Sequence, residues 1–284
     1  SQLDNMLVVK SPAPEYPADF SGGFILVNTK DVPSSNLFTI SVGTSLNDQT
    51  HFKKFLYNKG SGTDFLGFDN GFRSLKGGIN AVLSPMNNGY DLLNNGLNND
   101  WTVKDRRPLA DLSLNMNFSR RWVDSSGRTL AILGTVNYSN SYRTYLDMDN
   151  NLFGAYDTTH DCSNYLRKSI DDQYNHSVRI GTMLNFTYIP ASGNSRYEFK
   201  NIFNQLGKDR YTYRKGTDAQ SDYEESAEYY YQSRTTYNGQ FTGKHTLGNT
   251  DKLDWSAGYS YANRNMPDRR RYTTVLNEET NQLE

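Results

Sequence analysis

Arginine and tyrosine side chains gather in two short stretches whose chemistry is binding rather than bond making. Guanidinium groups hold carboxylate, sulfate or phosphate oxygens through paired hydrogen bonds, and a phenol ring stacks on a sugar face. An anionic or sugar-bearing ligand is therefore the predicted target of both stretches. The stretch "KDRYTYRKG" contains Arg210, Tyr211, Tyr213 and Arg214, and the stretch "DRRRY" contains Arg269, Arg270, Arg271 and Tyr272.

The remaining candidate residues form no constellation for catalysis or metal binding. Four histidines are scattered without metal-ligand spacing. The stretch "DMDNNLFGAYD" begins like a calcium loop, but Leu152 occupies the position where such a loop needs glycine. The pair Glu224 and Glu225 has no partner base in the sequence pattern. We predict no catalytic residue, no metal site, no cofactor and no enzymatic activity.

Composition narrows the class of protein. The 284 residues include 30 Lys plus Arg against 31 Asp plus Glu, with a pI near 6.4, so the sequence lacks the basic footprint of a nucleic-acid-binding protein. No stretch approaches the run of about 20 apolar residues that a membrane helix needs. The single cysteine, Cys162, cannot form an internal disulfide.

Seven segments alternate apolar and polar residues with period two, which is typical of a strand with one apolar face. In "DLSLNMNFSRRW", for example, Leu112, Leu114 and Met116 alternate with Ser113 and Asn115. Each strand is predicted to be about ten or more residues long. The seven segments are 36–46, 111–122, 128–139, 177–188, 197–204, 229–241 and 253–261.

Connection lengths between these strands alternate between long and short. Links of about 60, 30 and 20 residues alternate with "VDSSG", "IPASGNS" and "HTLGNTDK", and the seventh strand is followed by a tail for which no strand is predicted. Strands of 9 to 11 residues, with short turns at one end and long loops at the other, are typical of a transmembrane barrel. The fold class is predicted to be all-β: an antiparallel up-and-down transmembrane β-barrel, partial, with about seven long strands. A soluble β-sandwich is the alternative.

Aromatic residues mark the short-turn end of the apolar face. Rings at this level favour the boundary between hydrocarbon and water, where one edge is apolar and the other is wet. The sequence thus predicts an interfacial belt near the short turns. Its members are Phe38, Trp122, Tyr188, Tyr197, Phe241 and Trp255.

The opening block, "MLVVKSPAPEYPADFSGGFILVNTKDVP", contains an apolar strand ending in Lys10, then Gly22 and Gly23, then a strand ending in Thr29 and Lys30. These elements resemble the end of the plug domain of TonB-dependent outer-membrane receptors. The stretch "GTDFLGFDNGFRSL" also looks like a segment that many of these receptors have after the first barrel strand. The resemblance implies that residues 1–35 end a plug domain and that residues 36–284 begin the barrel.

The same resemblance implies a function and a location. Such receptors import a scarce, bulky nutrient through a plugged barrel in the outer membrane of Gram-negative bacteria. The expected partners are TonB, energised by the inner-membrane ExbB–ExbD complex, outer-membrane lipid, and an extracellular ligand such as a siderophore, glycan or peptide; nucleic acid is not expected. Because family members close with 22 strands, we expect this chain to be an excerpt of a longer receptor.

Two other functions remain open at this stage. A non-gated outer-membrane porin or adhesin barrel would have the same strands without a plug. A secreted carbohydrate-binding or hydrolytic β-protein would be soluble without detergent. For the arginine run, contact with lipopolysaccharide phosphates or plain solvation is the alternative to ligand binding.

Overall fold

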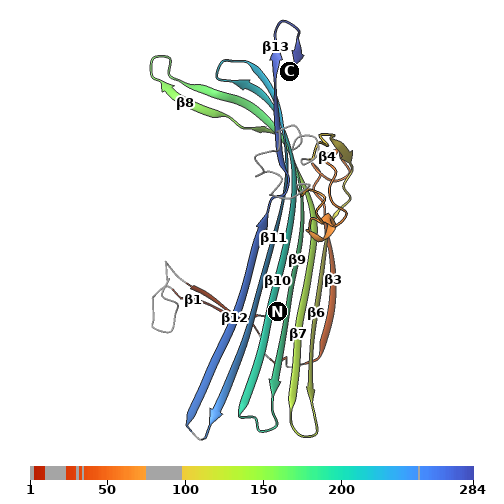
Figure 1. Cartoon of the computed structure of the whole chain (residues 1–284), viewed down its shortest axis with the longest axis vertical. Coiled ribbons are helices and arrows are strands. Elements are labelled where there is room, and N and C mark those ends of the chain that lie inside the picture. Colours follow the sequence, from red (N-terminus) through yellow and green to blue (C-terminus); the bar gives the residue numbers. More distant parts are fainter. Residues whose placement is uncertain (1–2, 10–23, 30–31, 34, 75–97, 249) are drawn as a thin grey trace, which may run out of the picture.

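One antiparallel sheet contains most strands of the protein (Figure 1). The computed structural model describes residues 3–9, 24–29, 32–33, 35–74, 98–248 and 250–284. The long strands of the sheet are β3 (Leu37–Ser45), β6 (Asp111–Val123), β7 (Thr129–Asp149), β9 (Cys162–Ile189), β10 (Ser195–Asp218), β11 (Tyr223–Leu247) and β12 (Asp251–Asn265). Shorter strands joined to it are β8 (Leu152–Asp157), β13 (Arg269–Asn277) and β14 (Gln282–Leu283).

The sheet is open. Its order runs β14-β13-β11-β10-β9-β7-β6-β3, with β12 paired to the lower part of β11 and β8 paired to β9. Within the part of the chain that the structure describes, β3 and β12 each have one neighbour and therefore one free edge. The predicted all-β, antiparallel meander is confirmed.

All seven predicted segments are strands of this sheet, and several strands extend far beyond the segments. Strand β9 has 28 residues, β10 has 24 and β11 has 25. The strand ends joined by the predicted short links "VDSSG", "IPASGNS" and "HTLGNTDK" lie together at the lower end of the sheet in Figure 1. The structure shows strand over much of the two links predicted after the third and fifth strands, because β7 and β9–β11 continue to pair above the predicted segments.

The prediction that no strand follows the seventh is wrong. Strand β12 ends at Asn265, and β13 then pairs with Glu224–Tyr230, the upper part of β11 that β12 does not reach. The residues of β13, "RRRYTTVLN", mix polar and apolar side chains on both faces, so they lack the alternation that identifies a half-apolar strand.

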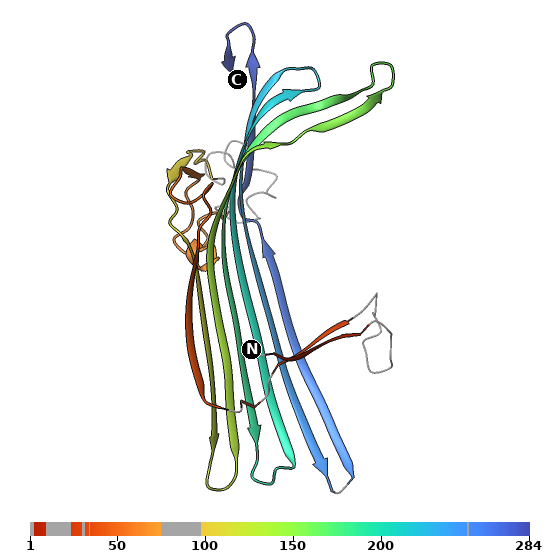
Figure 2. The ribbon, with the colours of Figure 1, turned by 180° about the vertical axis from the view of Figure 1, so that it is seen from behind.

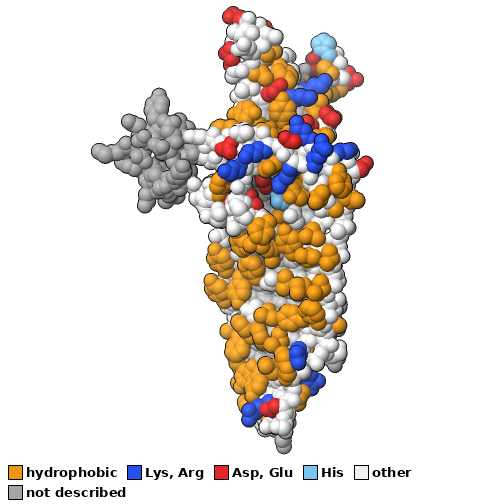
Figure 3. All heavy atoms as spheres, turned by 90° about the vertical axis from the view of Figure 1, so that its right-hand side faces the viewer, with side chains coloured by type: hydrophobic (Ala, Val, Ile, Leu, Met, Phe, Trp, Pro, Cys, Tyr) orange, Lys and Arg blue, Asp and Glu red, His pale blue; other side chains and the backbone are white. Residues whose placement is uncertain are grey.

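The register brings the predicted apolar residues onto one face, here called the apolar face. At the lower end, Trp122 pairs with Leu130, Leu130 with Tyr188, and Tyr188 with Tyr197, in one row across four strands. Trp255 continues this row on β12 by pairing with the glycine opposite Tyr197. Figure 3 shows apolar side chains as a broad band on this side of the molecule, with charged side chains above it. The opposite face, here called the polar face, carries mainly Asn, Ser, Thr and charged residues.

A polypeptide segment covers the upper part of the apolar face. This segment, here called the outer loop, comprises the described residues 46–74 and 98–110, with strands β4 (Phe55–Tyr57) and β5 (Lys104–Arg106) and the short 3-10 helix η1 (Asp64–Leu66). Strands β4 and β5 pair with each other in a separate antiparallel ladder.

The beginning of the chain forms a separate hairpin of β1 (Leu3–Val9) and β2 (Phe24–Thr29), with Val9 paired to Phe24. Figures 1 and 2 show this hairpin extending to the opposite side of the sheet from the outer loop. Of the predicted plug motif, Thr29 ends β2, whereas Gly22, Gly23 and Lys30 lie outside the described residues.

Candidate functional site

The predicted ligand-binding residues divide between the two faces of the sheet. Adjacent residues of a strand point to opposite faces, so each Arg–Tyr stretch contributes to both. Arg210, Arg214, Arg269 and Arg271 have the parity of the polar face, and Tyr211, Tyr213 and Arg270 have that of the apolar face. Because the residues of each stretch are adjacent in the sequence, each stretch was predicted to form one binding surface. The structure instead places the residues of each stretch on two opposite faces.

On the polar face, the predicted arginines differ in their pairing. One carboxylate, Glu228, accepts a hydrogen bond from Arg210 at 2.8 Å and from Arg269 at 2.8 Å. Arg214 binds both oxygens of Asp171, at 2.6 and 2.8 Å, a bidentate pair that holds β10 against β9. Hydrogen bonding to this guanidinium lowers the pKa of Asp171, although burial opposes the shift.

On the apolar face, Tyr211 belongs to a buried aromatic cluster. Phe55 of the outer loop is 1% exposed and meets the ring of Tyr174 edge to face, with ring centroids 5.5 Å apart. Tyr211 lies against both Tyr174 and Tyr229. Burial raises the pKa of Tyr229 to about 12. These tyrosines anchor the outer loop and are not free to stack on a ligand.

Arg270 is also occupied within the protein. It donates to Asp268 at 2.7 Å and to the carbonyl oxygens of Asn98 and Asp100 at 3.0 and 2.8 Å. Its guanidinium carbon lies 4.9 Å from the ring centroid of Trp101. Arg270 therefore fixes the outer loop to β13, a structural role that the sequence pattern did not reveal.

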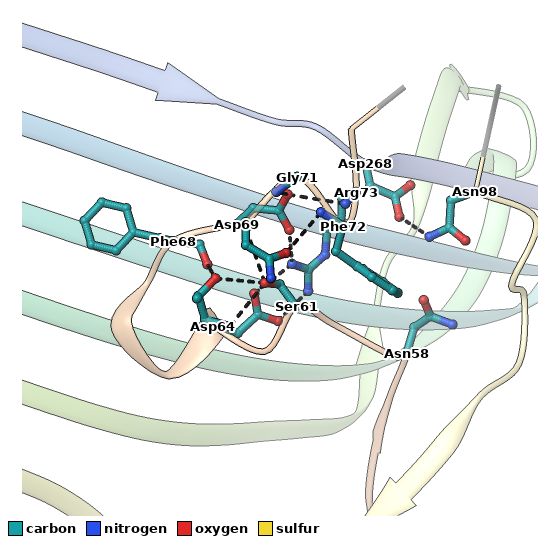
Figure 4. Close-up of polar contacts among 12 residues, drawn as sticks. Asn58, Ser61, Asp64, Phe68, Asp69, Gly71, Phe72, Arg73, Asn98 and Asp268 are labelled. Atoms are coloured by element: carbon teal, nitrogen blue, oxygen red, sulfur yellow. Dashed lines mark hydrogen bonds and ion pairs between the residues drawn. The ribbon is translucent and has the colours of Figure 1, made fainter. Parts of the chain in front are cut away.

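A second arginine, Arg73, organises the outer loop from within (Figure 4). Its two terminal nitrogens donate to both oxygens of Asp64, at 2.7 and 2.6 Å, and one of them also donates to Asp69 at 2.9 Å. The side chain is 4% exposed and its guanidinium carbon lies 3.9 Å from the ring centroid of Tyr231. These partners raise the pKa of Arg73 despite its burial. The segment "GTDFLGFDNGFRSL" thus contains a structural ion-pair network.

Beneath Arg73 lies a half-buried carboxyl group, Asp209 of β10, between His176 of β9 and Tyr231 of β11 in register. Burial raises the pKa of Asp209 to about 6, while Arg73 opposes this shift. Burial lowers the pKa of His176 to about 3, so this imidazole is neutral at physiological pH.

Two glycines allow the outer loop to approach the sheet. Gly67 ends η1 with φ of 78°, a left-handed conformation that suits glycine. A Cβ atom added to Gly207 of β10 would lie 2.5 Å from the Cα atom of Gly67, so neither position has room for a side chain. Next to this contact, the Gln205 amide donates to the carbonyl oxygen of Gly67 at 2.5 Å.

The polar face carries a shallow hollow with a volume of about 540 Å³. Polar side chains from β6, β7, β10 and β11 line it, including Asn115, Asn137, Asn204 and Thr236. Cross-strand register places these four residues in one row. The arrangement places hydrogen-bonding groups side by side along the polar face of the sheet.

Comparison of the chain with protein-family models, curated proteins and solved structures finds no match. Among the described residues, no group of three or more His, Cys, Asp or Glu side chains is arranged to hold a metal ion. The described part of the chain also contains no helix that is long and apolar enough to cross a membrane.

Proposed function

We propose that the chain is part of a TonB-dependent outer-membrane receptor that imports a scarce, bulky nutrient. The observation that carries this proposal is the division of the sheet into an apolar band on one face and a polar wall on the other. Strands that separate lipid from water need this division, with aromatic rings at the boundary.

The height of the exposed apolar band supports the assignment to a membrane. On β10 the band begins at Tyr197, in the aromatic row, and ends near Gln205, where the outer loop starts to cover the face. This interval is close to the 9 to 11 residues that a tilted strand needs to cross the hydrocarbon layer. The strand above it, with Asp209 and Tyr211, then projects beyond the lipid on the extracellular side.

The hairpin of β1 and β2 supports a plug in preference to an open pore. In Figures 1 and 2 it extends on the side of the sheet opposite the outer loop. Because the outer loop covers the apolar face, this is the side of the polar face. In the proposed receptor this side faces the lumen, and further strands added at the free edges of β3 and β12 close the barrel around it. TonB, energised by the ExbB–ExbD complex, would then displace the plug to admit the ligand.

Membrane fractionation and single-channel recording test this function together. The protein, expressed from its complete gene, should fractionate with the outer membrane and should conduct little current in planar lipid bilayers. Urea at a concentration that unfolds a plug but not a barrel should then open a large conductance. Steady conductance without urea would show an ungated porin instead. Recovery as a soluble protein without detergent would contradict the membrane assignment altogether.

A further inference from the structure

Basic side chains line a second hollow on the polar face, above the row of asparagines. Its volume is about 430 Å³, and it lies across β9–β12 and the start of β13. Three of its cations, Lys208, Arg210 and Arg269, belong to the stretches that the sequence singled out. The six cations in its lining are Arg179, Lys208, Arg210, Arg234, Arg264 and Arg269.

Cross-strand register gives the spacing of these charges. Arg179, Arg234 and Arg264 share one row, in which Leu206 occupies the β10 position. Lys208 lies two residues further up β10, and Arg210 lies four residues further, level with Arg269. With strands about 4.8 Å apart and a rise of about 3.4 Å per residue, the cations cover about 14 Å in each direction. A single small anion would contact only a fraction of them.

Protein carboxylates neutralise little of this charge. Within the residues that the structure describes, Glu228 is the carboxylate that pairs with the cluster, and it binds Arg210 and Arg269. Arg179, Lys208 and Arg234 have no ion pair there, and Arg264 donates only to the sulfur of Met266, at 3.5 Å. By contrast, nearby Arg214 has its own carboxylate, Asp171. Like charges held together without partners repel each other and attract anions into the hollow.

We propose that this hollow binds a polyanionic oligosaccharide, one that carries sulfate or carboxylate groups on successive sugar units. Guanidinium forks bind such groups bidentately, and the spacing of the cations matches several anionic groups rather than one. The Arg210 guanidinium carbon lies 4.7 Å from the ring centroid of Tyr230, so this ring holds one of the cations in the lining. The cluster faces away from the apolar band, which excludes lipid phosphates as its partner. The inference rests on the proposed function, because it takes the polar face to line the import path.

A calorimetric titration of the detergent-solubilised protein, expressed from its complete gene, tests this site. The probes are a sulfated heparin-derived tetrasaccharide and the neutral maltotetraose. The double variant Arg179→Gln and Arg234→Gln should bind the sulfated probe at least about tenfold more weakly than the natural protein, since two charge-assisted contacts are lost. The matched double variant Lys244→Gln and Lys252→Gln removes the same charge from the polar face at the turn end and should change affinity less than twofold.

Each outcome decides the proposal. Selective binding of the sulfated probe, lost in the arginine variant alone and weakened by added salt, supports it. Equal affinity for the neutral probe, or equal loss in both double variants, overturns it. Both arginines are exposed, so thermal unfolding of the variants should match that of the natural protein. If the sulfated probe binds but the urea-gated conductance is absent, the site stands and the gated-import function fails; the reverse result refutes the site alone.

Discussion

Replacement of the half-buried Asp209 by asparagine should stabilise the protein at neutral pH and have little effect in acid. Burial raises the pKa of this carboxyl from 3.8 to about 6, with Asp64 and Asp268 adding to the shift and with Arg73 and Arg106 opposing it. The folded state therefore holds the proton more tightly than the unfolded state. The contribution of this carboxyl to stability therefore falls as pH rises from about 4 to about 6 and is constant above that range.

The pKa shift sets the size of the effect. A rise from 3.8 to about 6, at about 1.4 kcal/mol for each pH unit, corresponds to about 3 kcal/mol lost at pH 7.5. Asparagine has nearly the same shape and carries no charge, so Asp209→Asn should recover most of this free energy. His176, the neighbour in register, contributes with the opposite sign: its pKa is lowered from 6.5 to about 3, so it costs stability as pH falls below about 6.5. This contribution is present in both proteins and cancels in the difference between Asp209→Asn and the natural protein.

Guanidinium denaturation in lipid vesicles, at pH 4 and pH 7.5, measures the free energy of unfolding for this prediction. Asp209→Asn should gain up to about 3 kcal/mol at pH 7.5 and only about 0.6 kcal/mol at pH 4. The exposed control Asp48→Asn should change little at either pH. A loss of stability in Asp209→Asn at pH 7.5 would refute the reasoning, because it would mean that attraction to Arg73 outweighs the cost of burial.

Three further substitutions test the outer loop and the apolar band. Arg73→Met should destabilise the protein by about 3 to 5 kcal/mol in the same denaturation assay, because it leaves buried carboxylates unpaired. Gly207→Val should force the outer loop off the sheet, since its Cβ meets Gly67, and protease cleavage of that loop should become faster than in the natural protein. Met116→Arg should cost about 2 to 4 kcal/mol in vesicles, whereas Asn115→Arg on the polar face should be tolerated; equal costs would contradict the face assignment.

The apolar band and its strands were predictable because apolar and polar residues alternate within it. Leu112 to Trp122 follow this pattern, and β6 contains all of them. Above the band, the outer loop covers the apolar face of the sheet, so the residues on that face pack against protein. Tyr229 and Tyr231 have the parity of the apolar face but are buried under the outer loop, at 4% and 3% exposure.

The candidate site was less predictable because it depends on register between distant strands. Arg179 and Arg234 share a row only through the pairing of β9, β10 and β11. Nothing near either residue in the sequence indicates this. The Arg–Tyr stretches attracted attention by composition, yet strand geometry sends alternate members to opposite faces. Arg73 was missed for a similar reason, since Tyr231 and Asp209 are far from it in the sequence.

The outer loop also constrains the order of folding. It follows the first long strand, yet it packs against strands that come much later in the sequence. Gln205 contacts Gly67 across 138 residues, and Tyr229 contacts Trp101 across 128. Contacts with such separation form only after the intervening chain has paired, and they slow folding. Docking of the outer loop should therefore be a late kinetic step. Until β9–β11 assemble, the early aromatic residues of this loop remain exposed to whatever chaperones escort the chain.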